Sequence, residues 1–77
     1  MSKIELAKDI RKMLVKDIEN YFLTEREEEI GDLSAEFLLD FILETIGPHI
    51  YNRAINDAHT FMSEKTEDLF ALEKPVR

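Results

Sequence analysis

Apolar residues recur at steps of three and four along most of the chain, and this spacing predicts helices. The first predicted helix spans residues 3–22, and Ser2 and Glu5 have the spacing of a capping box at its start. Arg11 falls within its apolar face, so we expect the guanidinium to reach a carboxylate on the next helix. That apolar face consists of Ile4, Ala7, Ile10, Leu14, Ile18, Tyr21 and Phe22.

The second predicted helix, residues 33–46, is unusually apolar. Asp32 precedes it and can cap the free N–H groups of its first turn. At about 100° per residue, apolar side chains occupy roughly two-thirds of its circumference. The remaining strip is acidic and consists of Glu36, Asp40 and Glu44. A helix that is apolar on nearly all sides needs more than one neighbour to cover it.

Gly47 and Pro48 predict that this helix ends and that a third begins at once. Glycine suits the left-handed position after a helix, and proline suits the first turn of the next. The third predicted helix spans residues 48–72, with Lys65 within its apolar stripe. That stripe consists of Tyr51, Ala54, Ile55, Ala58, Met62 and Leu69, bordered by Ile50, Phe61 and Leu72. Its opposite side is polar but uncharged and consists of Asn52, Asn56, His59 and Ser63.

These patterns predict an all-α fold, in which residues 1–77 form a single compact three-helix domain with a long C-terminal helix. The apolar surface of the second helix further predicts a homodimer, either intertwined or side by side. The residues expected at the interface are Phe37, Leu38, Phe41 and Ile42 of the second helix and Asn52, Asn56 and His59 of the third. Whether the dimer forms through the second or the third helix stays open. The alternative is a monomer whose exposed patch binds another protein.

Charge and composition exclude several classes of partner. The chain has 17 acidic and 10 basic residues, a net charge of −7, and no cysteine. This balance argues against binding nucleic acid or anionic membrane surfaces, since both depend on Lys and Arg. No apolar run approaches the ~20 residues of a membrane span. The N-terminal residues lack the apolar core of a signal peptide, so we expect a cytoplasmic protein.

The central residues of the chain resemble a known family. The features that carry this resemblance are Ile30-Gly31-Asp32-Leu33, Leu38-Leu39-Asp40-Phe41, Ile46-Gly47-Pro48, Tyr51-Asn52 and Ala54, together with Tyr21-Phe22 and Ala71-Leu72-Glu73-Lys74-Pro75. The sequence is similar to an uncharacterised bacterial family, domain of unknown function 2164. The resemblance implies a small stand-alone bacterial protein. It implies no activity and supplies no catalytic residues.

The acidic strip is the one candidate for metal chemistry. Asp32, Glu36 and Asp40 follow one another at helical steps, and carboxylate oxygens are the ligands that Ca²⁺, Mg²⁺ and Mn²⁺ prefer. A metal site also needs ligands from a second element, so we expect a hydrated strip paired with Arg11 or Arg53. His49 and His59 lie ~15 Å apart along one predicted helix and cannot share an ion within one chain.

Two functions follow from the sequence. We expect a non-enzymatic interaction protein that self-associates, has no cofactor and can bind another protein. The alternative is a protein that binds a metal or small molecule through the acidic strip.

Overall fold

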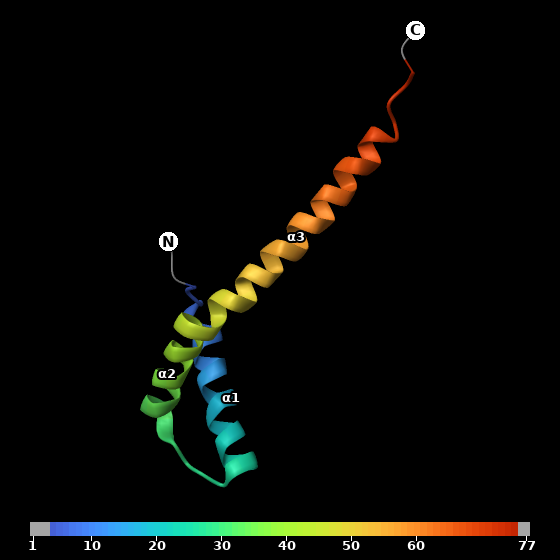
Figure 1. The fold of residues 1–77 in the computed structure, drawn as a ribbon. Coiled ribbons are helices and arrows are strands. Elements are labelled where there is room, and N and C mark those ends of the chain that lie inside the picture. The colour runs from blue at the N-terminus through green and yellow to red at the C-terminus, as the bar shows by residue number, and fades with distance from the viewer. Residues whose placement is uncertain (1–3, 76–77) are drawn as a thin grey trace.

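The computed structural model describes residues 4–75 and consists of a helical hairpin from which one long helix projects (Figure 1). Helix α1 spans Lys8–Arg26 and α2 spans Gly31–Phe41. A π-helical turn, η1, covers Ile42–Ile46, and α3 spans Gly47–Phe70. The range 4–75 contains no strand, so the predicted all-α class is confirmed.

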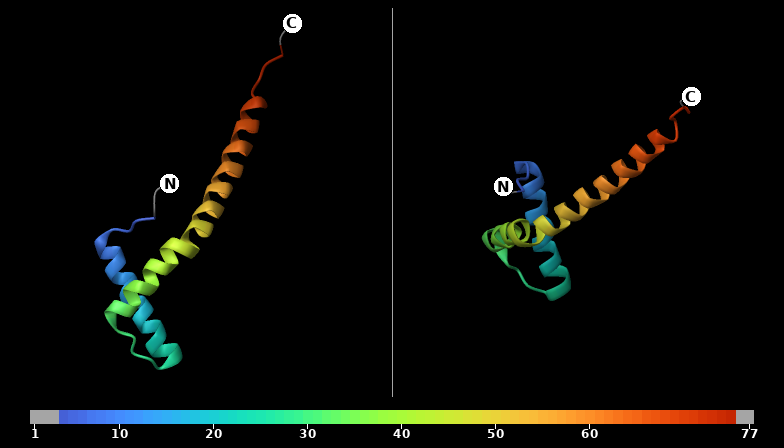
Figure 2. Two further views of the ribbon diagram at one scale, coloured as in Figure 1. Left: turned by 60° about the vertical axis from the view of Figure 1, so that its left-hand side comes forward. Right: turned by 45° about the horizontal axis from the view of Figure 1, so that its top comes forward.

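The chain is extended and does not adopt the expected compact packing of three helices. Elements α2, η1 and α3 follow without a break and form one rod over residues 31–70; its α2 part lies beside α1, and its α3 part points away from α1 (Figure 2). The Cα radius of gyration is 20.8 Å and the extents are 74 × 28 × 21 Å. A compact chain of this length would have a radius of gyration of about 11–12 Å.

The prediction that Gly47 ends a helix in a left-handed conformation is wrong. Its φ of −52° and ψ of −45° are right-handed, and its N–H donates to the carbonyl of Ile42 across a π turn. Pro48 lacks an N–H, and its ring would crowd the carbonyl of Glu44 in a regular α-helix. The wider π turn just before the proline accommodates this ring. A residue before proline avoids helical geometry partly because of its Cβ, which glycine lacks.

Gly47 also permits a close approach between the N-terminal segment and the rod. A Cβ placed on Gly47 would lie 2.9 Å from Cδ1 of Ile4. The segment before α1 therefore crosses directly over the joint between η1 and α3. Gly47 and Pro48 mark a joint within one rod rather than the boundary between two helices.

Helix α1 begins and ends later than predicted. It starts at Lys8 rather than at residue 3 and continues to Arg26 rather than ending at residue 22. Ser2 lies outside the described residues, so the predicted capping box is not assessed. At the other end, Glu27 takes a left-handed φ of 53° and the N–H of Glu28 donates to the carbonyl of Phe22 at 3.1 Å. After this turn the chain reaches Gly31, which has a φ of 79° and is the first residue of α2.

The core lies between α1 and α2 and is small. Its buried side chains are Val15 of α1 and Ala35 and Leu39 of α2. Four half-buried residues pack around them: Leu14, Ile18, Ile30 and Leu43. Helix α3, all of whose residues are described, has no buried side chain. Within residues 4–75, no helix is both long and apolar enough to cross a membrane.

Candidate interaction surface

The acidic strip of α2 lies beside the basic side chains of α1. Nη2 of Arg11 donates to Oδ1 of Asp40 at 2.6 Å, and Nε of Arg11 lies 3.9 Å from Oε1 of Glu36. Nζ of Lys16 lies 3.4 Å from Oδ1 of Asp32. The expected pairing of Arg11 with a carboxylate of the next helix is therefore confirmed. Asp32 sits in the first turn of α2, after Gly31, rather than in the capping position expected before the helix.

These ion pairs affect whether the candidate carboxylates could bind a metal ion. Asp32, Glu36 and Asp40 each stand within 4 Å of a cationic nitrogen, which would compete with a metal ion for their oxygens. In the described part of the chain, no group of three His, Cys, Asp or Glu side chains is placed to hold a metal ion. The ion pairs of the strip join α2 to α1 within the hairpin.

The carboxyl groups of Glu19 and Asp32 lie close together beside the loop that joins α1 to α2. Hydrogen bonding with Asp32 raises the pKa of Glu19, and partial burial and the charge of Asp32 add to this rise. Lys16, whose Nζ lies 3.7 Å from Oε2 of Glu19, opposes it. The same hydrogen bond, together with Lys16, lowers the pKa of Asp32.

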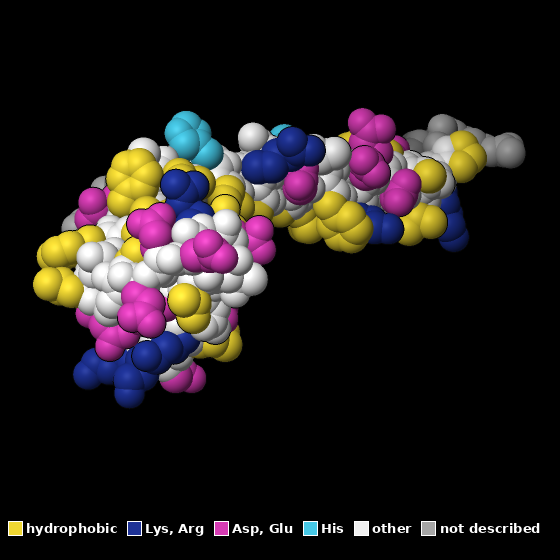
Figure 3. Space-filling view, turned by 90° about the horizontal axis from the view of Figure 1, so that it is seen from below, with side chains coloured by type: hydrophobic (Ala, Val, Ile, Leu, Met, Phe, Trp, Pro, Cys, Tyr) yellow, Lys and Arg dark blue, Asp and Glu magenta, His cyan; other side chains and the backbone are white. Residues whose placement is uncertain are grey.

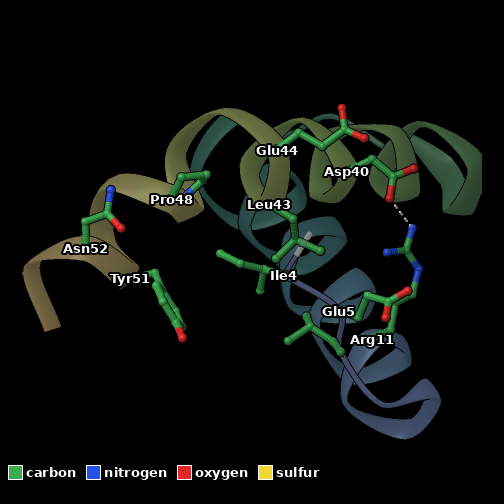
Figure 4. A pocket seen from close by; sticks show the side chains of 10 residues that line it. Ile4, Glu5, Arg11, Asp40, Leu43, Glu44, Pro48, Tyr51 and Asn52 are labelled. Atoms are coloured by element: carbon green, nitrogen blue, oxygen red, sulfur yellow. Dashed lines mark hydrogen bonds and ion pairs between the residues drawn. The ribbon is translucent and has the colours of Figure 1, made fainter. Parts of the chain in front are cut away.

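An open groove of about 920 Å³ lies where the N-terminal segment meets the rod (Figure 4). Its apolar lining consists of Ile4, Leu6, Leu43, Pro48 and Tyr51. Figure 4 shows Ile4 and Leu43 close together, with Tyr51 extending from α3 beside them. The ring of Tyr51 is 58% exposed, so it does not pack into a core as the sequence suggested. The groove is the point at which the covered face of the rod ends and its bare face begins.

Two apolar surfaces have no cover within the described chain. The first, which we call the α3 stripe, follows one side of the projecting helix at alternating steps of four and three. Its members are Tyr51, Ile55, Ala58, Met62, Lys65 and Leu69 of α3 and Leu72 in the turn that follows it, and Lys65 alone among them is charged. The second, the α2 strip, consists of Leu33, Phe37 and Phe41 on the side of α2 away from the core. In the space-filling view, hydrophobic side chains are exposed both on the hairpin and along the projecting arm (Figure 3).

The family of the chain follows from its sequence match. The model of an uncharacterised conserved protein family, DUF2164, matches residues 4–72. The chain belongs to the DUF2164 family. The match covers both helices of the hairpin, the π turn and the whole of α3. No curated protein and no solved structure matches the chain.

The interface residues expected from the sequence fall into three environments in this DUF2164 protein. Phe37 and Phe41 are 63% and 53% exposed and belong to the α2 strip. Leu38 and Ile42 are half-buried. The polar candidates Asn52, Asn56 and His59 are exposed, and at about 100° per residue they face away from the α3 stripe. Phe37 and Phe41 therefore lie on the hairpin part of the rod, and the polar candidates lie on its projecting part.

Sequence reasoning assigned the α3 stripe to the core of a three-helix domain. In the DUF2164 structure Ile55, Met62 and Leu69 are 51%, 61% and 65% exposed. Among the helical elements of the described range, α3 contacts only η1, which precedes it in the same rod. Helix length is the feature of the sequence that indicates this surface. Helix α3 has 24 residues, whereas α1 has 19 and already packs against α2, so α1 does not cover α3.

Proposed function

We propose that the protein acts by self-association, forming a homodimer through the α3 stripe, and that the dimer binds another protein rather than catalysing a reaction. The observation that carries this proposal is a helix of 24 residues with an apolar stripe and no buried side chain. In water a helix gains most of its stability from packing an amphipathic face rather than from its own hydrogen bonds. A second copy supplies a face of equal length and matching chemistry.

The accessible surface of the chain supports the size of such an interface. The chain exposes 7187 Å², whereas a compact monomer of 9.0 kDa would expose about 4,900 Å². The difference is roughly 2,300 Å² per chain, or twice that for a pair. Obligate homodimers bury about 2,000–5,000 Å² in total. The uncovered surface is therefore of the size that a permanent dimer requires.

The stripe also has the chemistry of a helix–helix seam. Its alternating steps of four and three are those of the a and d positions in coiled coils. Ala58 within the stripe and Ala54 at its border have small side chains, which allow the backbones of two helices to approach closely. Binding of a metal or small molecule is the weaker alternative, because Arg11 and Lys16 already stand beside the carboxylates concerned. We also propose the cytoplasmic location that the sequence led us to expect.

Light scattering after size-exclusion chromatography tests the proposal. We expect a mass twice the 9.0 kDa of one chain, and a mass of one chain at all concentrations would overturn it. The matched variants are Ile55→Glu, which puts a charge into the stripe, and Asn56→Glu, which puts the same charge one residue further along, on the polar side. Ile55→Glu should give a monomer and Asn56→Glu a dimer. The reverse result would move the interface to the polar side of α3, and dissociation by Phe37→Glu alone would move it to the α2 strip.

A further inference from the structure

We infer that the two α3 stripes pair antiparallel, so that the C-terminal end of the partner's α3 lies in the groove beside Ile4 and Tyr51. This inference rests on the proposed self-association and adds its orientation and register. It assigns the groove an occupant, the apolar end of a second copy of this chain. Three features of the structure lead to it: the phase of the rod, the position of Lys65 and the reach of the N-terminal segment.

The π turn brings the core face of α2 and the α3 stripe into one line. In an uninterrupted α-helix, Leu39 would lie about 110° around the axis from the middle of the α3 stripe. The π turn holds one extra residue, which removes about 100° of rotation between the two segments. Leu39 and Leu43 then share a face with Tyr51 and Ile55. Helix α1 covers the first part of this continuous face, and the second part is bare.

The charges of α3 determine the orientation. Lys65 lies within the stripe, so a parallel pair would place it against its own copy in the seam, where like charges repel. An antiparallel pair separates the two ammonium groups. The C-terminal half of α3 also carries Glu64, Glu67 and Asp68, which a parallel pair would bring together. An antiparallel pair places them beside the N-terminal half, where Arg53 and Asp57 form an ion pair and their charges balance. The opposed helix dipoles favour the same orientation.

The N-terminal segment determines the register. Ile4 crosses the rod at Gly47, so a partner helix can cover the face only from Pro48 onward. Antiparallel pairing of residues 48–72 then places the partner's Leu69 against Tyr51 and the partner's Leu72 against Pro48. In this register the two-fold axis passes close to residue 60, and the two Lys65 residues lie about 15 Å apart along the helices. The apolar end of the partner helix fills the groove that Ile4 and Leu43 help to line.

Engineered disulfides test this arrangement without background, because the chain has no cysteine. Tyr51→Cys and Leu69→Cys are made as separate proteins. In the antiparallel register, identical positions lie about 27 Å apart along the helices, too far for a disulfide. Neither variant alone should therefore form a disulfide dimer on oxidation. An equimolar mixture should form one that joins residue 51 of one chain to residue 69 of the other, identified by peptide mass spectrometry.

The outcomes separate the inference from the proposed function. Disulfide dimers of each variant alone would indicate parallel pairing and overturn the inference, while the dimer itself would stand. A monomeric mass of the wild-type chain by light scattering would overturn both. Because either substitution can weaken the seam, Ile55→Cys mixed with Lys65→Cys provides a second pair in the same register. A dimeric protein in which neither mixture forms the mixed disulfide contradicts the register, and Ser63→Cys on the polar side is the control for random collision.

Discussion

Leu39 contributes more to the stability of the hairpin than any exposed leucine, and its truncation measures how much. It is 3% exposed and forms the core together with Val15 and Ala35. Leu39→Ala removes three carbon atoms, which is about 2.4 kcal/mol of transfer free energy, and leaves a cavity that adds to the loss. We expect a decrease of about 3 kcal/mol in the free energy of unfolding. A chain of this length has about 4–12 kcal/mol in total.

Thermal unfolding followed by circular dichroism measures the effect. At about 4–8 °C per kcal/mol for a chain of this size, Tm should fall by about 12–24 °C. Leu33→Ala is the matched control, because it makes the same substitution in the same helix at a side chain that is 65% exposed. It should lower the free energy of unfolding by less than about 1 kcal/mol. Protein concentration must be equal throughout, because association makes Tm depend on it. Equal effects of the two substitutions would refute the placement of the core.

Two further predictions concern the start of α2, namely Gly31 and the neighbouring pair of Glu19 and Asp32. Gly31 has a φ of 79° with open space around it, so Gly31→Ala should cost about 1–2 kcal/mol for conformational reasons alone. Gly31→Asn should cost less, because asparagine tolerates this conformation. Equal urea midpoints for the two variants would contradict this account. Because Asp32 raises the pKa of Glu19 above its ordinary value of 4.5, the stability from Glu19 is complete below pH 4.5 and is lost as pH rises through the folded pKa. Glu19→Gln should therefore raise Tm at pH 7 more than at pH 4, and an equal effect at both pH values would count against the pairing.

Local features of the fold could be predicted from the sequence where one physical cause dominates. Helical spacing identified the helical segments, and the position of Arg11 within an apolar face indicated its pairing with α2. The Gly47-Pro48 joint could not be predicted, because glycine and proline have two opposite uses. They end most helices, but here a π turn accommodates the proline and glycine relieves the contact with the residue before it. Gly47 also lies against Ile4, a contact between distant parts of the chain that no local pattern contains.

The candidate surface was only partly predictable for a related reason. The sequence contains more apolar surface than one chain covers, and that conclusion did not depend on where the helices lie. Assigning the uncovered part required knowing that α3 leaves the hairpin. The compact three-helix domain predicted from the sequence buried Ile55 and Met62 and left the polar side of α3 as the candidate interface with a partner. Once α3 projects, those side chains are the exposed ones, while Asn56 has the ordinary surroundings of a surface residue.

In the proposed dimer, one face of the rod is covered partly by the folding of its own chain and partly by association with the partner. Helix α1 covers this face along α2, and Ile4 of the N-terminal segment contacts the rod at Gly47. Beyond the joint the same face continues as the α3 stripe, which gains its cover from the partner. If the π turn were lost, the stripe would rotate by about a quarter turn relative to the hairpin, and the partner's C-terminal end would no longer meet the groove. The Gly47-Pro48 joint therefore connects the fold of one chain to the position of the other.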